Sequence, residues 1–245
     1  MDVVDRLAKA TGALSFGEPV THVYAPLDYA SASVECFVKT YAKSGIEALF
    51  LGMNPGPWGM VQTGIPFGEV HHVRSFLGIE EPVARPANEH PKRPVDGFAC
   101  SRSEVSGRRL WEWVAQRFER PEAFFERFFI WNWCPLAFLE ASGKNRTPDK
   151  LQAHERAPLE AACDSALRDI VEVLKPARII GVGGFAGKRA RMALAETGLP
   201  IDTILHPSPA SPMANRGWAA QAEAQLEAMG VVLGDPRESL AASSV

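Results

Sequence analysis

The stretch Ala48-Leu-Phe-Leu51, followed by Gly52-Met-Asn-Pro-Gly-Pro-Trp-Gly59, decides the predicted fold. The four apolar residues predict a buried strand, and the run rich in glycine and proline after them predicts a loop. A strand that runs into an unusual loop is how α/β proteins build sites at the ends of their strands. We therefore expect Asn54, inside this loop, to lie at a functional site.

Apolar runs predict three further strands at residues 128–131, 177–182 and 201–205. Helical periodicity predicts helices at residues 28–43, 69–77, 110–118, 123–127, 159–174, 185–197 and 215–229, whereas residues 81–107 are expected to be irregular. Strands that alternate with helices favour an α/β fold with a central four-stranded parallel sheet flanked by helices on both faces. We predict a single domain over residues 1–245, with its core at about 20–235.

Three of the four predicted strands end in polar turns, which contain Asn54, Asn132 and His206. The carboxyl ends of parallel strands meet at one edge of the sheet, so these side chains can converge although they are far apart in sequence.

The remaining strand ends in Gly181-Val-Gly-Gly-Phe-Ala186, which matches a dinucleotide-binding pattern and leaves a nucleotide-dependent enzyme as one alternative. That pattern normally follows the first strand, and an acidic residue ends the next one, whereas Asp202 opens the next strand here. We favour the interpretation that these small residues let a helix pack closely on the strand.

Composition is that of an ordinary globular protein, with 46% hydrophobic and 22% charged residues and a net charge of −3. The sequence shows no targeting signal and no apolar run of the roughly 20 residues that a membrane span needs. We expect a cytoplasmic protein, associated with the nucleoid if bacterial, without membrane contact.

Four widely spaced cysteines predict buried free thiols and no metal site. Local basic groups that could offset the acidic total are Lys92, Arg93, Arg108, Arg109, Lys144, Arg146 and the run from Lys188 to Arg191.

Several motifs resemble, in the same order, those of the single-strand-selective monofunctional uracil-DNA glycosylases. The first is Leu51-Gly-Met-Asn-Pro-Gly-Pro-Trp-Gly-Met60 with Gln62-Thr-Gly-Ile-Pro-Phe-Gly-Glu69. The second is His206-Pro-Ser-Pro209 followed by Pro212-Met-Ala-Asn-Arg-Gly-Trp218, and shorter similarities lie at residues 103–107, 132–136 and 142–148. The resemblance covers roughly residues 20 to 235 and implies the uracil-DNA glycosylase fold.

The resemblance implies an enzyme that flips a uracil-type or deaminated base out of DNA and hydrolyses its N-glycosidic bond. Such an enzyme leaves an abasic site and needs no metal or cofactor. Asn54 and His206 would be catalytic, and the residues expected at the base are Gly52, Met53, Gly56, Met60, Phe67 and Asn132. Gly56 and Met60 would lie near C5 of the base.

The chemistry of these side chains agrees with the implied reaction. A histidine at a rigid turn can stabilise the departing base by donating a hydrogen bond to its carbonyl oxygen. An asparagine carbonyl at Asn54 can orient the attacking water. Asn132 can donate to O4 and accept from N3–H of uracil, whereas cytosine presents the reverse pattern. Phe67 can stack on the flipped base.

The family also inserts a wedge into DNA from the segment after the second motif. Its DNA-binding residues here would be Ser208, Pro209, Ala210, Ser211, Pro212, Met213, Asn215 and Arg216. Animal members carry arginine where this chain has Ala210, so Met213 or Arg216 becomes the candidate wedge. We expect a monomer that acts on single-stranded and duplex DNA containing damaged bases. The alternative is a non-catalytic DNA-lesion-binding module on the same fold.

Overall fold

The four predicted strands form one parallel sheet in the computed structural model, which describes residues 1–233. Its strand order is β3-β2-β6-β7, with β2 at Ala48–Gly52, β3 at Phe128–Asn132, β6 at Arg178–Val182 and β7 at Ile201–Ile204. Every residue of β2 and β3 is buried, as expected for central strands covered on both faces. This arrangement confirms the predicted α/β class and the four-stranded parallel sheet.

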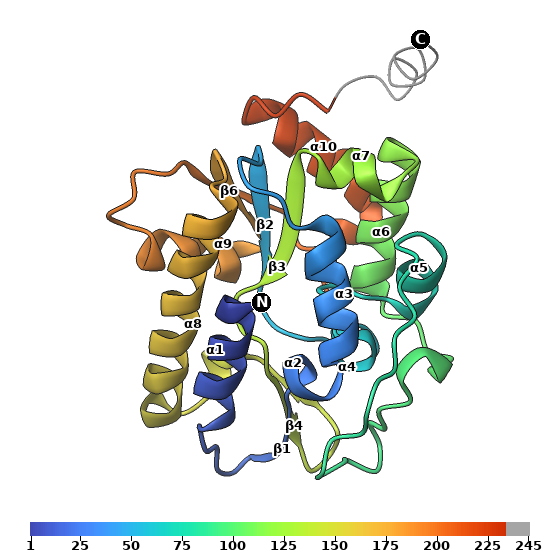
Figure 1. The fold of residues 1–245 in the computed structure, drawn as a ribbon, viewed down its shortest axis with the longest axis vertical. Coiled ribbons are helices and arrows are strands. Elements are labelled where there is room, and N and C mark those ends of the chain that lie inside the picture. Colours follow the sequence, from blue (N-terminus) through green and yellow to red (C-terminus); the bar gives the residue numbers. More distant parts are fainter. Residues whose placement is uncertain (234–245) are drawn as a thin grey trace.

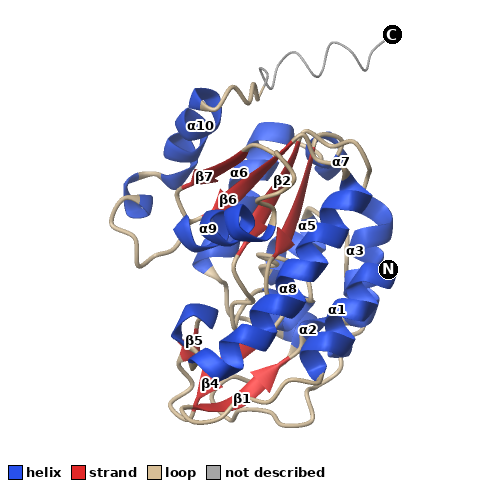
Figure 2. Cartoon of the chain, turned by 90° about the vertical axis from the view of Figure 1, so that its left-hand side faces the viewer, coloured by secondary structure: helices blue, strands red, loops and turns tan. Residues whose placement is uncertain are grey.

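Helices cover both faces of this sheet (Figures 1 and 2). Helices α8 and α9 lie on one face, while Trp113 of α6 packs against Phe50 of β2 on the other. The helices are α1 (Asp2–Gly12), α2 (Pro26–Tyr29), α3 (Ser31–Tyr41), α4 (Met60–Thr63), α5 (Val70–Ser75), α6 (Val105–Phe118), α7 (Pro121–Phe125), α8 (Ala153–Leu174), α9 (Gly184–Ala193) and α10 (Trp218–Ala228), with short 3-10 turns at Gly97–Ala99, Pro148–Lys150 and Ala214–Arg216. None of the helices within residues 1–233 is long and apolar enough to cross a membrane.

A second, antiparallel sheet was not predicted from the sequence. It consists of β1 (Val20–Tyr24), β4 (Ala137–Glu140) and β5 (Asn145–Arg146), and Figure 2 shows it below the main sheet. Its strands have two to five residues, and β1 pairs with β4 across more than a hundred residues of chain. Periodicity carries little signal over such short segments.

Several predicted helix boundaries were wrong. The predicted helix at 28–43 is split, because Ala30 leaves the helical region at φ −113° and ψ 27°. Helix α6 begins at Val105 rather than at residue 110. Helix α8 begins at Ala153 rather than at residue 159, because a capping box of Gln152 and Glu155 starts the helix before Pro158. The single-domain prediction over 1–245 includes residues 234–245, which lie outside the described part of the chain.

Small residues in β6 and α9 let the helix pack closely on the strand, which is the interpretation that we favoured for the dinucleotide-like pattern. A Cβ atom at Gly181 would lie 2.3 Å from the backbone nitrogen of Gly187 and 2.5 Å from its Cα. Of the four cysteines, which are all free, Cys100, Cys134 and Cys163 are buried and Cys36 is half-buried.

We predict that Gly181→Ala destabilises the protein by about 1–3 kcal/mol, because the added methyl group overlaps backbone that has little room to move. The matched control is Gly184→Ala, where an added Cβ would have no atom within 4 Å. Denaturant titration of both variants measures the difference. Equal stabilities would show that α9 does not need this close approach.

Candidate active site

The register of the parallel sheet brings the three polar strand ends together. Gly52 pairs with Asn132 across β2 and β3, and Val182 pairs with Ile204 two residues before His206. A single cavity of about 570 Å³ is lined by Asn54, Asn132 and His206, together with Phe67. Its volume lies within the range of small-molecule sites. The predicted convergence of the three strand ends is confirmed.

Asn54 is oriented by the chain that follows β3. Its side-chain nitrogen donates a hydrogen bond to the carbonyl oxygen of Leu136 at 3.3 Å. The loop is tied to β3 as well, since the amide of Cys134 donates to the carbonyl of Met53 at 2.8 Å. With its nitrogen engaged in this way, Asn54 has its carbonyl oxygen available as an acceptor.

Asn132 presents a buried oxygen without a partner. Its Nδ2 lies 3.2 Å from the sulfur of Met60, whereas its Oδ1 has no hydrogen-bond partner among the described residues. A Cβ at Gly52 would lie 2.1 Å from this Oδ1 and 2.7 Å from the ring of Phe67, so only glycine fits there. An unpaired buried acceptor costs roughly 1–3 kcal/mol. The group is therefore arranged for a donor that a ligand can supply.

Phe67 is held in an unfavourable backbone conformation at φ +54°. Its carbonyl oxygen accepts a hydrogen bond from the indole of Trp111 at 3.1 Å, and its ring centroid lies 6.0 Å from that of His206. Left-handed backbone at an aromatic residue is costly and persists only where its surroundings impose it.

His206 is positioned by helix α10 and is neutral at pH 7. The indole of Trp218 donates to the carbonyl of Leu205 at 2.6 Å, and the amide of Leu205 donates to the side chain of Gln225 at 2.7 Å. Burial lowers the pKa of His206 to about 4. A Cβ at Gly183, whose φ is +94°, would come 3.0 Å from the Cβ of His206, so this glycine makes room for the imidazole.

The other residues predicted at the base differ in their placement. Met53 and Gly56 line the cavity, while Met60 is fully buried against the side chain of Asn132. Gly52 is not among the lining residues; its lack of a side chain leaves room for Asn132 and Phe67.

The predicted DNA-binding loop begins at the cavity and continues onto the surface. Ser208 and Pro209 line the cavity, and Met213 is 56% exposed. Arg109, one of the candidate basic residues, donates to the carbonyl oxygen of Pro207 at 3.2 Å and to the side chain of Asn215 at 2.8 Å. Arg109 therefore braces this loop. The other predicted residues of the loop, Ala210, Ser211, Pro212 and Arg216, are not among those that line the cavity.

Several other residues that line the cavity were not singled out from the sequence. They are Pro57, Trp58, Ser103, Glu104, Val105, Ser106, Asn145 and Thr147. The guanidinium groups of Arg93 and Arg102 lie 5.2 and 4.4 Å from the ring of Trp58, which places two cations beside the cavity. The segments at 103–107 and 142–148 were noted as similar to the family, and that similarity was the available signal.

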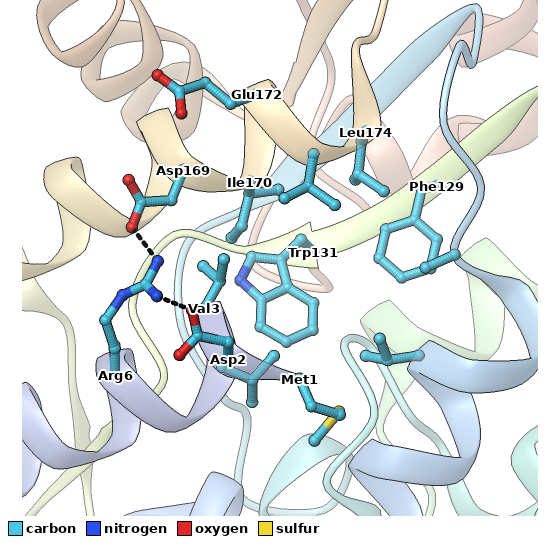
Figure 3. Close-up of a pocket in the computed structure, with 14 residues that line it drawn as sticks. Met1, Asp2, Val3, Arg6, Phe129, Trp131, Asp169, Ile170, Glu172 and Leu174 are labelled. Carbon is cyan, nitrogen blue, oxygen red and sulfur yellow. Dashed lines mark hydrogen bonds and ion pairs between the residues drawn. The ribbon is translucent and has the colours of Figure 1, made fainter.

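A smaller hollow of about 300 Å³ lies away from this cavity, between α1, α8 and β3 (Figure 3). Trp131 points into it, and Arg6 bridges Asp2 and Asp169 at its rim. Trp133 also packs away from the cavity, where its indole donates to Asp164 at 2.8 Å. The two tryptophans that flank Asn132 in sequence therefore do not line the cavity.

Known proteins are similar to this chain in sequence and in fold. The family model of the uracil DNA glycosylase superfamily matches residues 38–228. The single-strand selective monofunctional uracil DNA glycosylase of Mus musculus is 46% identical over 229 residues, which are 93% of this chain and 82% of that protein. The Bos taurus protein of the same name is 47% identical over 221 residues, or 89% and 81%.

A solved structure agrees on the fold. The crystal structure of wild-type Pedobacter heparinus SMUG2 superposes with a TM-score of 0.66 at 20% identity, and the match covers 93% of this chain and 97% of that one. The sequence matches show that the chain belongs to the single-strand-selective monofunctional uracil-DNA glycosylase family of the uracil-DNA glycosylase superfamily.

Proposed function

We propose that this protein is a monofunctional DNA glycosylase of base-excision repair, which binds a flipped uracil-type or deaminated base in the cavity and hydrolyses its N-glycosidic bond. The observation that carries the proposal is the convergence of Asn54, Phe67, Asn132 and His206 on one cavity. Membership of a family whose relatives are named as uracil-DNA glycosylases supports it.

The base would be held by its face and by one edge. Phe67 stacks on the ring, and the buried Oδ1 of Asn132 accepts from N3–H. This contact satisfies an acceptor that has no partner within residues 1–233. Cytosine has an acceptor at N3 and would leave two acceptors facing each other. This mismatch would exclude the normal base from which uracil arises by deamination.

Bond cleavage would need little proton transfer. The bond between C1′ and N1 breaks, its electron pair stays on the base, and the neutral imidazole of His206 donates a hydrogen bond to O2 as negative charge develops there. A water oriented by the carbonyl oxygen of Asn54 attacks C1′ of the cation-like sugar and loses a proton to solvent. The products are the free base and an abasic site with the DNA backbone intact.

The loop from Ser208 to Arg216 is proposed to enter the DNA beside the flipped nucleotide. Met213 is its exposed apolar side chain, and filling the gap in the stack offsets a few kcal/mol of unstacking. Action on both single-stranded and duplex DNA, a monomeric state and a cytoplasmic location stay predictions.

The direct test is a panel of single-lesion oligonucleotides carrying uracil, 5-hydroxymethyluracil, hypoxanthine or xanthine, each scored for free base and for abasic sites. We expect free base and alkali-labile abasic sites from uracil in particular. Tight binding of the lesions without any base release would instead support a non-catalytic lesion-binding module.

His206→Ala is expected to slow single-turnover release of uracil by roughly 10²–10³-fold, the usual effect of losing one donor to a developing oxyanion. The matched control is His154→Ala, because His154 is exposed on α8. Unchanged release by a folded His206→Ala protein would exclude His206 from stabilising the leaving group.

Asn132→Asp is expected to lower the release of uracil and with it the preference for uracil over cytosine. A carboxylate cannot donate to O4, so release of uracil should fall roughly 10-fold or more relative to wild type. Competition between uracil- and cytosine-containing oligonucleotides measures the selectivity. An unaltered substrate range would remove Asn132 from recognition of the base edge.

A further inference from the structure

Two arginines that the proposed mechanism does not use lie beside the cavity, on the ring of Trp58. The guanidinium carbons of Arg102 and Arg93 lie 4.4 and 5.2 Å from the centroid of this ring. Arg102 is exposed, whereas Arg93 and Trp58 are half-buried. The negative face of an indole attracts cations, so the ring holds two long side chains that would otherwise be mobile. We call these three residues the Trp58 cluster.

The two positive charges of the Trp58 cluster have no carboxylate partner. None of the ion pairs within residues 1–233 includes Arg93 or Arg102, and the buried Nε of Arg93 has no hydrogen-bond partner there. The acidic residues in the segment around Arg93 are engaged elsewhere, since Glu89 and Asp96 both pair with Arg85. Two cations on one ring repel each other, and an anion bound by both would relieve this repulsion.

A buried glutamine joins two of the segments that carry the cluster. Nε2 of Gln62 donates hydrogen bonds to the carbonyl oxygens of Pro57 at 3.0 Å and Pro94 at 2.9 Å. These prolines are the sequence neighbours of Trp58 and Arg93, and Gln62 is fully buried. The ring and one of its arginines are therefore held together by the interior of the protein.

Glu104 joins the third segment to the same ring. It lies two residues after Arg102, and its Oε2 accepts a hydrogen bond from the backbone N–H of Trp58 at 3.2 Å. Burial raises the pKa of Glu104 to about 7, so its carboxyl group is only partly ionised at neutral pH. Glu104 therefore fixes the position of the cluster without neutralising it. A site assembled before its ligand arrives loses little conformational entropy on binding.

The place of Trp58 indicates which anion reaches the cluster. Trp58 lines the cavity and is half-buried, so it lies where the cavity meets solvent. A flipped base enters the cavity, whereas the phosphates on either side of its sugar stay outside, because burial of an unpaired charge is costly. The anions closest to the cluster are then phosphates of the strand that carries the damaged base.

We propose that Arg93 and Arg102 bind phosphate groups of the damaged strand next to the flipped nucleotide, with Trp58 holding both guanidinium groups in place. This inference rests on the proposed function. A guanidinium group matches phosphate oxygens with two parallel N–H donors. Such a local site explains how a chain with a net charge of −3 binds a polyanion. It serves single-stranded and duplex DNA alike, whereas a wedge at Met213 has a gap to fill only in a stacked duplex.

The test is the salt dependence of DNA binding, measured by fluorescence anisotropy. The labelled probe contains one deoxyuridine whose sugar is fluorinated to prevent cleavage, and is used single-stranded and as a duplex. Arg93→Gln and Arg102→Gln should each lower the slope of log affinity against log salt concentration, by about 0.9 in the duplex and about 0.7 in the single strand. Release of uracil from a cleavable probe at saturating protein should stay within about threefold of wild type, because the lost contact lies outside the reacting atoms.

Arg120→Gln is the matched control, because it removes the same charge from an exposed residue beyond the far end of α6. Its slope should equal that of wild type. Arg102→Gln decides the outcome if Arg93→Gln does not fold, since Arg102 is exposed. A wild-type slope in folded Arg102→Gln would overturn the proposal, and so would a change confined to the duplex, which would place the contact on the complementary strand. Wild type that binds both probes but releases no uracil from cleavable ones would instead overturn the proposed function.

Discussion

Gly52 and Asn132 are register partners at the carboxyl ends of adjacent parallel strands, and the site depends on how closely they approach. With a Cβ at position 52, the side chain of Asn132 and the ring of Phe67 could not both stay where they are. On the other side of β2, the same register brings Gly181 level with Leu51, and Gly183 then leaves room for His206. The parallel sheet thus brings three distant strand ends, at Asn54, Asn132 and His206, to one cavity.

The polar groups in that cavity are held in an environment that disfavours charge and leaves hydrogen-bonding capacity unused. His206 is neutral because burial disfavours its charged form. Within residues 1–233, Oδ1 of Asn132 has no hydrogen-bond partner and Glu104 has no ion-pair partner. An unpaired buried oxygen is costly, and a donor on a nucleobase would satisfy that of Asn132. Groups fixed before the substrate arrives need no reorganisation during the reaction, which is the main source of electrostatic catalysis.

The sequence predicted the parallel sheet and its strand ends well, because buried strands such as 48–51 and 128–131 are short apolar runs that stop in distinctive turns. It predicted the small antiparallel sheet not at all, since β5 has two residues and β1 finds its partner β4 far along the chain. Local periodicity holds no information about such pairing.

Part of the site was equally inaccessible to sequence analysis. Asn54 and His206 stand out because they follow strands, whereas Glu104 sits before a helix, where acidic residues are common and solvated. Its contact with Gly56 arises only from folding. Similarly, the sequence presented Arg109 only as a local basic group, and the structure shows that it braces the loop at Pro207 and Asn215.

The central claim is that a single pyrimidine is held at once by Phe67, Asn132 and His206. A crystal structure of the protein with a uracil-containing oligonucleotide, its sugar fluorinated to prevent cleavage, tests this most directly. The account predicts the uracil ring stacked on Phe67, with N3–H donating to Oδ1 of Asn132 and O2 accepting from His206. A uracil bound outside this cavity, or one whose N3–H points away from Asn132, would contradict it.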